Sequence, residues 1–145
     1  MNYRDAYLDL QEKHRQELTD FPIAYAFDKK QLEEALEKLG AKKDECVTVA
    51  GHGDIMKRTD VPAFYAMMKR HKEEVHEALK NKDFAEAAFL YEMDNHEYAI
   101  NWSADEDVLS CFNLSLEKLK EMDLVDAYNR ARNAHFKHAE EWDMI

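Results

Sequence analysis

The sequence predicts an α+β fold: a helix-dominated single domain over residues 1–145 with a small two- or three-stranded antiparallel sheet. Three observations predict it. The 145 residues include only 3 Gly and 2 Pro, so few positions interrupt helices. Apolar residues recur at spacings of three and four along most of the chain. Short alternating segments flank the pair Gly51 and Gly53, which predicts a hairpin around residues 51–53.

The first forty residues predict two helices separated by a short strand. Apolar residues at helical spacing over residues 3–18 predict the first helix, and alternation over residues 23–27 predicts the strand. Asp28 and Gln31, three positions apart, predict a capping box for the second helix. Gly40 is suited to end that helix, because glycine adopts the left-handed conformation at little cost.

The middle of the chain predicts the hairpin and then the longest helix. Alternation at residues 47–49 and the apolar pair at residues 55–56 predict its two strands. The glycines between them supply the positive φ that such a turn requires. Asp60 is suited to cap a helix whose apolar face runs to Leu79.

The remainder of the chain predicts helices alone. A turn at residues 81–83 precedes a helix that ends near Asn95, and a short helix is expected over residues 105–112. Ser115 is suited to cap another helix. A final apolar stripe runs over residues 124–142.

Charge is both strongly negative and uneven. The net charge is −11, which argues against a general basic surface for nucleic acid. No Lys or Arg occurs from Asp83 to Glu117, a segment that we call the acidic interval. Two interpretations follow: an ordinary solvated acidic surface, or a surface that docks on a basic partner.

We expect a cytoplasmic protein that does not enter a membrane. No apolar run approaches the roughly 18 residues that a membrane span needs, and the first residues lack the pattern of a signal peptide. The two cysteines, Cys46 and Cys111, are too few for a disulfide framework or a cysteine zinc site. This cysteine usage fits a reducing compartment.

No motif predicts an enzyme, a metal or a cofactor. The Gly51-His52-Gly53 segment lacks the remainder of a Walker or dinucleotide loop. Glu92 with His96, and His135 with His138, have helical spacings that place each pair on one face, but neither pair makes a complete ligand set. Whether either pair binds a metal stays open. Cys111 lies in the acidic interval, which would raise the pKa of its thiol and disfavour nucleophilic catalysis.

The chain resembles a family of small acidic proteins from bacteriophages and mobile elements, mainly of Firmicutes. The resemblance covers most of residues 3–119, and the segments that carry it are Ala50-Gly51-His52-Gly53, Met56 to Asp60, Met68 with Arg70-His71, and Tyr91 to Tyr98. The chain departs from the pattern at His52, where a small residue or glycine is expected. The family has no assigned activity, so the resemblance implies a phage or mobile-element setting and no catalytic residues.

These observations favour a phage or mobile-element protein that binds and inhibits a bacterial defence protein, of the anti-CRISPR or antirestriction type. Its acidic surface would cover a basic, nucleic-acid-binding surface of the partner. The residues expected to contact that partner are acids of the acidic interval and one aromatic anchor: Glu92, Asp94, Glu97, Trp102, Asp105, Glu106 and Asp107. Direct nucleic-acid binding is not expected, and apolar stripes with seven Met are compatible with a homodimer.

Two alternatives use other residues. A nucleotide-binding or nucleotide-sequestering protein would use the glycine loop and nearby cations: Gly51, His52, Gly53, Lys57, Arg58 and Arg70. A hydrolase would use the cluster of Glu92, His96 and Glu97.

Overall fold

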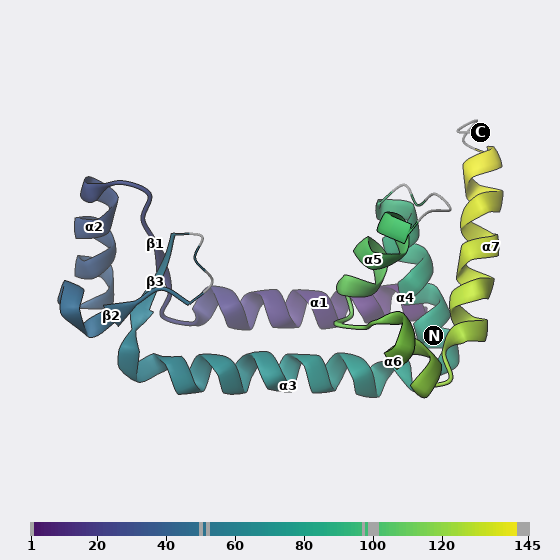
Figure 1. Ribbon diagram of the computed structural model, residues 1–145, viewed down its shortest axis with the longest axis horizontal. Helices are drawn as coiled ribbons and strands as arrows, with labels where there is room; N and C mark the ends of the chain where they lie inside the picture. The colour runs from purple at the N-terminus through teal and green to yellow at the C-terminus, as the bar shows by residue number, and fades with distance from the viewer. Residues whose placement is uncertain (1, 50, 52, 97, 99–101, 142–145) are drawn as a thin grey trace. The chain divides into compact units, whose positions relative to one another are not determined.

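Helices dominate the protein, and a three-stranded antiparallel sheet accompanies them, which confirms the predicted α+β class (Figure 1). The computed structural model describes residues 2–49, 51, 53–96, 98 and 102–141, and only the backbone of Trp102 and Ser103. Contacts divide the chain into two compact units. The helical unit comprises residues 1–11 and 72–145, and the sheet unit comprises residues 12–71. The expectation of a single domain stays a prediction, and each unit is described by itself.

The sheet unit contains the hairpin that the glycine pair predicts. The strands follow the order β1-β3-β2, and both pairings are antiparallel. Ala24 pairs with Ile55, and Val47 pairs with Met56. The elements that lie wholly within this unit are β1 (Ala24–Tyr25), α2 (Lys29–Leu39), the 3₁₀ turn η1 (Lys43–Glu45), β2 (Cys46–Val47), β3 (Asp54–Lys57) and the 3₁₀ turn η2 (Arg58–Asp60).

Asp28 and Gly40 act at the ends of α2 as the sequence predicts, but the predicted capping box is only half formed. The Asp28 side chain accepts a hydrogen bond from the Gln31 backbone N–H at 2.8 Å. The Gln31 side chain accepts from the N–H of Phe27, one residue before the position that a standard capping box uses. Gly40 ends the helix with a φ of 63°, in the left-handed region.

The helical unit joins parts of two long helices to four shorter ones. The unit boundary falls within α1 (Tyr3–Asp20) and α3 (Val61–Leu79). The remaining helices are α4 (Lys82–Asn95), α5 (Trp102–Ser110), α6 (Leu116–Glu121) and α7 (Val125–Glu141). Asn81 and Ser115 cap α4 and α6 through their side chains, which accept from backbone N–H groups. Helices α4 and α7 pack side by side (Figure 1).

Large apolar side chains fill the centre of the helical unit. Phe89 and Phe112 are fully buried, with ring centroids 5.0 Å apart in an edge-to-face arrangement. Tyr7, from the start of α1, packs against Phe84 and Phe112. This core fixes α4 and its neighbours, and therefore the polar side chains that α4 carries. Among the described residues, no helix has the length and apolar composition needed to cross a membrane.

Candidate functional site

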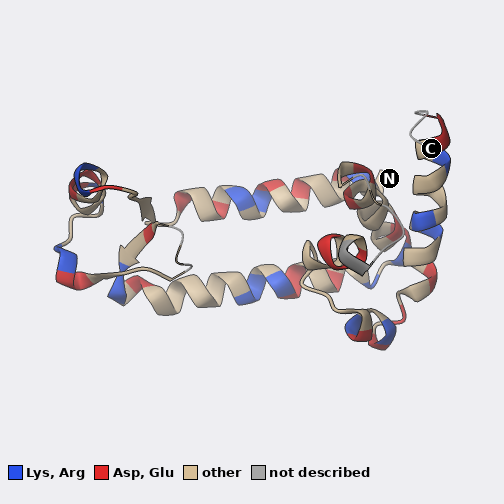
Figure 2. Cartoon of the chain, turned by 45° about the horizontal axis from the view of Figure 1, so that its top comes forward, with Lys and Arg blue, Asp and Glu red and all other residues tan. Residues whose placement is uncertain are grey.

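Helix α5 carries the three consecutive acids of the acidic interval (Figure 2). These acids differ in exposure. Glu106 and Asp107 are exposed, whereas Asp105 is half-buried. The Asp105 Oδ1 atom accepts hydrogen bonds from the hydroxyls of Tyr98 and Tyr128, each at 2.6 Å. Burial and these hydrogen bonds raise the pKa of both phenols above its ordinary value. Asp105 therefore holds α5 in place, and Glu106 and Asp107 remain available to a partner.

A groove of about 490 Å³ lies between the exposed side of α5 and the start of α6. Leu109, Leu114 and Leu116 give it an apolar surface, and Leu116 is 38 % exposed. Glu106 and Glu117 also line the groove. The structure thus places apolar side chains beside exposed acids, a combination that the sequence pattern did not identify. We call it the acidic groove.

One acid of α4, Glu92, belongs to the interior of the helical unit. Glu92 is 4 % exposed, and its Oε1 atom accepts from the Tyr7 hydroxyl at 3.2 Å. Burial, and then the nearby Glu92 carboxylate, raise the pKa of Tyr7. Glu92 therefore does not contribute to an exposed acidic surface, although the sequence suggested this. Glu97 lies outside the described residues, as does the side chain of Trp102.

Asp94 joins α4 to α7 through two histidines. Its Oδ1 atom lies 2.7 Å from Nδ1 of His135, and its Oδ2 atom lies 2.9 Å from Nδ1 of His138. The buried His135 also places Nε2 at 2.8 Å from the Tyr98 carbonyl oxygen, which can only accept. Nε2 therefore donates to this carbonyl oxygen, and Nδ1 of His135 faces the Asp94 carboxylate. The predicted pair of His135 and His138 thus converges on a carboxylate.

The glycine loop follows the hairpin prediction, and a buried acid organises it. Gly51 and Gly53 have φ values of 77° and 80°. Asp54 is 6 % exposed, and its carboxylate accepts from the Val49 N–H at 2.8 Å and the Thr48 hydroxyl at 3.2 Å. A carboxylate in this position opposes the binding of a phosphate. The role of Asp54 was not predicted from the sequence, because its partners are defined by the fold of the loop.

Gly53 also lies close to the Phe27 ring, a side chain that is 76 % exposed and would have to shift to admit a Cβ atom. A Cβ atom at this position would lie 2.6 Å from the ring of Phe27, nearer than carbon atoms normally approach. The positive φ of Gly53 therefore explains the glycine better than the contact with this exposed ring does. His52 lies outside the described residues.

The cations proposed for a nucleotide do not gather at the glycine loop. Lys57 ends β3, and the Arg58 guanidinium donates to the Asp44 carbonyl oxygen at 3.4 Å. Arg70 forms an ion pair with Glu17 of α1. It lies nine residues after Val61, about 14 Å further along α3 at 1.5 Å per residue.

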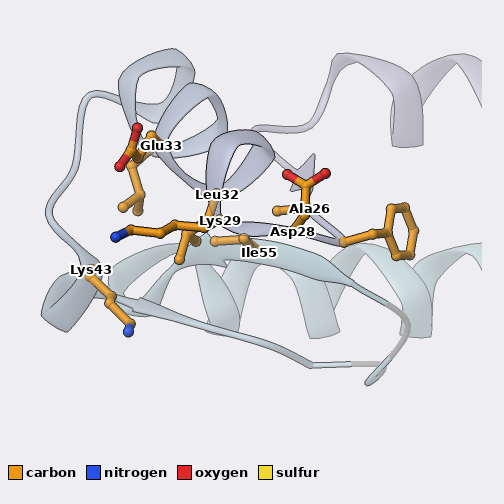
Figure 3. A pocket seen from close by; sticks show the side chains of 9 residues that line it. Ala26, Asp28, Lys29, Leu32, Glu33, Lys43 and Ile55 are labelled. Carbon is orange, nitrogen blue, oxygen red and sulfur yellow. The ribbon is translucent and has the colours of Figure 1, made fainter.

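A pocket of about 580 Å³ opens between α2 and the sheet (Figure 3). Leu32 and Ile55 supply apolar surface, and Lys29 and Lys43 extend toward one end. The carboxylates of Asp28 and Glu33 offset these two cations. With two groups of each sign, this pocket has no evident preference for an anion or a cation.

The fold also places Cys111 close to the predicted pair of Glu92 and His96. One ligand atom from each of the three side chains lies within 4.8 Å of the others. Burial and the Glu92 carboxylate raise the pKa of the Cys111 thiol to about 12, so the thiol is not an activated nucleophile. The sequence placed Glu92 and His96 on one face, but Cys111 is fifteen residues beyond His96 and joins them only through tertiary packing.

Comparison with known proteins identifies one family whose model matches this chain. A model of a family of unknown function, DUF7659, matches residues 6–134, most of the chain. Searches of curated proteins and of solved structures find no match.

Proposed function

We propose that this chain, which belongs to DUF7659, a family of unknown function, acts by binding a protein. The surfaces of the chain itself support this role. The acidic groove receives a basic segment of the partner that carries an apolar anchor. In the phage or mobile-element setting that the resemblance implies, the partner is a nucleic-acid-binding protein of a bacterial defence system. The proposed role is inhibition without catalysis, in the cytoplasm.

One observation carries this proposal: the acidic groove combines apolar surface with acidic side chains, and no basic side chain lines it among the described residues. Leu116 is 38 % exposed beside Glu106 and Glu117. Burying a fully exposed leucine side chain contributes about 1.5–3 kcal/mol, so burying the exposed 38 % of Leu116 contributes a correspondingly smaller amount. Exposed charges of one sign mainly accelerate association and select partners of opposite charge. The two contributions differ in salt dependence, so they can be measured separately.

The mechanism is steric exclusion. A partner surface that binds phosphates is rich in Lys and Arg, and such a surface complements Glu106, Asp107 and Glu117. An inhibitor seated there blocks access of the nucleic acid and needs no chemical step. Asp105 supports this surface from beneath, since its carboxylate is occupied by two tyrosine hydroxyls.

The test uses a fluorescent amphipathic peptide of about 14 residues, built from leucine and lysine, as a stand-in for the basic segment. Its binding is measured by fluorescence anisotropy at about 50 mM and about 500 mM salt. We expect the double variant Glu106→Lys/Asp107→Lys to weaken binding at least tenfold at low salt and much less at high salt. Leu116→Ser should weaken binding similarly at both salt concentrations.

The matched control carries the same change of charge on the other unit. Glu33 and Glu37 are exposed acids of α2, so Glu33→Lys/Glu37→Lys alters net charge equally. This control should bind like the wild-type protein. If both double variants weaken binding equally, the attraction reflects net charge alone and the proposal is wrong. A peptide of equal charge without the leucines should bind weakly.

A further inference from the structure

Three side chains of the helical unit bring metal-binding atoms of three kinds to one place. Glu92 and His96 lie one turn apart at the C-terminal end of α4, and Cys111 follows the last residue of α5. A carboxylate oxygen, a ring nitrogen and a sulfur lie within 4.8 Å of one another. We propose that Glu92, His96 and Cys111 bind a divalent transition-metal ion, and that zinc(II) fits the site best.

The separations between these atoms agree with ligands around a tetrahedral ion. Nε2 of His96 lies 3.3 Å from Oε2 of Glu92 and 3.5 Å from Sγ of Cys111. With zinc bonds of about 2.1 Å to nitrogen and oxygen and about 2.3 Å to sulfur, tetrahedral geometry places N and O about 3.4 Å apart. The same geometry places N and S about 3.6 Å apart. Little rearrangement is needed to admit an ion.

The pattern of contacts favours an ion over a catalytic proton relay. In a Cys-His-acid relay, the thiol and the carboxylate contact opposite nitrogens of the imidazole. Here both Glu92 and Cys111 approach the same atom, Nε2 of His96. Two contacts at one ring nitrogen do not match the arrangement of that relay, whereas three donor atoms around one point can share one cation.

A second layer of hydrogen bonds orients the carboxylate. The Oε1 atom of Glu92 faces Tyr7 and Gln11, at 3.2 and 3.5 Å, which leaves Oε2 directed toward His96. The Gln11 amide also donates to the Tyr7 hydroxyl at 2.6 Å. Partners of this kind hold the ligands of known metal sites in position. The Glu92 charge, 4 % exposed, would be neutralised in part by the ion.

The ligand set indicates both the ion and an open coordination position. A mixture of thiolate, imidazole and carboxylate suits zinc, a borderline ion, better than magnesium or calcium. The Cys111 thiol binds as the thiolate and releases its proton to solvent. Three protein ligands leave a fourth position for water, and the exposed side of the site admits it, since the His96 side chain is 40 % exposed.

Cobalt(II) provides a direct test, because its thiolate complexes absorb in the near ultraviolet and its tetrahedral complexes absorb in the visible. The full chain is stripped with a chelator, kept reduced and titrated with cobalt(II). We expect these bands to saturate at about one ion per chain and to disappear when zinc(II) is added. Cys111→Ser should abolish the near-ultraviolet band, and His96→Asn should weaken binding at least tenfold.

Cys46→Ser is the matched control, because Cys46 lies in the sheet unit and is the only other cysteine in the sequence. This variant should bind cobalt(II) like the wild type. Cys111 is exposed, so its replacement should leave the far-ultraviolet circular dichroism unchanged. The inference is overturned if the wild-type protein gives no thiolate band, if Cys111→Ser retains it, or if Cys46→Ser loses it.

Discussion

The two units of the protein differ in the apolar core that stabilises each of them. The helical unit has a continuous core with large side chains, including the fully buried Phe89, Phe112 and Met93. The cluster of the sheet unit has only three buried residues, Ala24, Ala35 and Leu39, although Met56 is also fully buried in this unit. Apolar burial contributes free energy in proportion to area, so the helical unit gains far more from its core. In the sheet unit, local hydrogen bonds such as those at Asp54 and at the start of α2 accompany this smaller core.

The buried acids of the two units show the same contrast. Glu92 in the helical unit accepts from Tyr7, 85 residues away in the sequence. Asp54 in the sheet unit accepts from Thr48 and Val49, six and five residues away. The first carboxylate depends on the packing of separate helices, whereas the second is part of one loop. Replacing Glu92 should therefore affect several helices, whereas replacing Asp54 should affect mainly one loop.

The largest expected effect is the loss of unfolding free energy when a buried leucine is replaced by alanine, and it can be compared between the two units. Leu79→Ala, at a fully buried position of the helical unit, should cost about 3–5 kcal/mol of unfolding free energy. Leu39→Ala, at the 8 % exposed residue of the small cluster, should cost about 2 kcal/mol. Urea unfolding followed by circular dichroism measures both. An equal cost would show that the sheet unit depends on its apolar cluster as strongly as the helical unit does.

A smaller and more local effect is expected at the hairpin. Asp54→Ala removes the acceptor of the Val49 N–H and the Thr48 hydroxyl, and should cost about 1–3 kcal/mol. Amide hydrogen exchange should accelerate in residues 46–57 and stay unchanged in α4 and α7. Asp44→Ala, at an exposed acid of η1, is the matched control and should leave exchange unaltered. Faster exchange throughout the chain would contradict the local role.

The smallest effect concerns pH and a surface ion pair of the sheet unit. The Arg70 guanidinium, together with His71, lowers the pKa of Glu17 from 4.5 to about 2. A carboxyl whose pKa is lower in the folded protein stabilises it above pH 4.5, and this contribution is lost as the pH falls toward 2. The stability difference between wild type and Glu17→Gln should therefore shrink over that range, as measured by urea unfolding.

The helical unit provides the matched pair for this measurement. Lys82 lowers the pKa of the exposed Asp123 through one ion pair, where Glu17 has two cationic partners. Asp123→Asn should change the pH dependence in the same direction and by less. A difference that grows on acidification would mean that neither pair stabilises the folded chain.

Much of the secondary structure was predictable because its signals are local. Asp28, Gly40 and Ser115 act at helix ends within four residues of their partners. Gly51 and Gly53 adopt the positive φ that the hairpin required. The strand over residues 23–27 is real but is reduced to Ala24–Tyr25, and the α5 helix starts at Trp102, three residues before its predicted start. Strand pairing and helix packing set those limits, and neither can be read from spacing.

The functional side chains were harder to predict, because their roles depend on distant partners. The sequence placed Glu92 in an acidic surface, yet the packing of α1 against α4 buries it beneath Tyr7. It associated His135 with His138 but could not show that Asp94 lies between them. Leu109, Leu114 and Leu116 were unremarkable as sequence until folding placed them beside Glu106 in one groove.

By itself, the sequence determined the helices, the hairpin and the concentration of acid between Asp83 and Glu117. These features follow from backbone preferences and from charges that lie close together along the chain. Only the tertiary structure decided which acids are exposed, where apolar side chains border them, and that Cys111 meets Glu92 and His96. The physical reason is that exposure and coordination depend on distances between side chains far apart in the chain, which packing of the whole core sets.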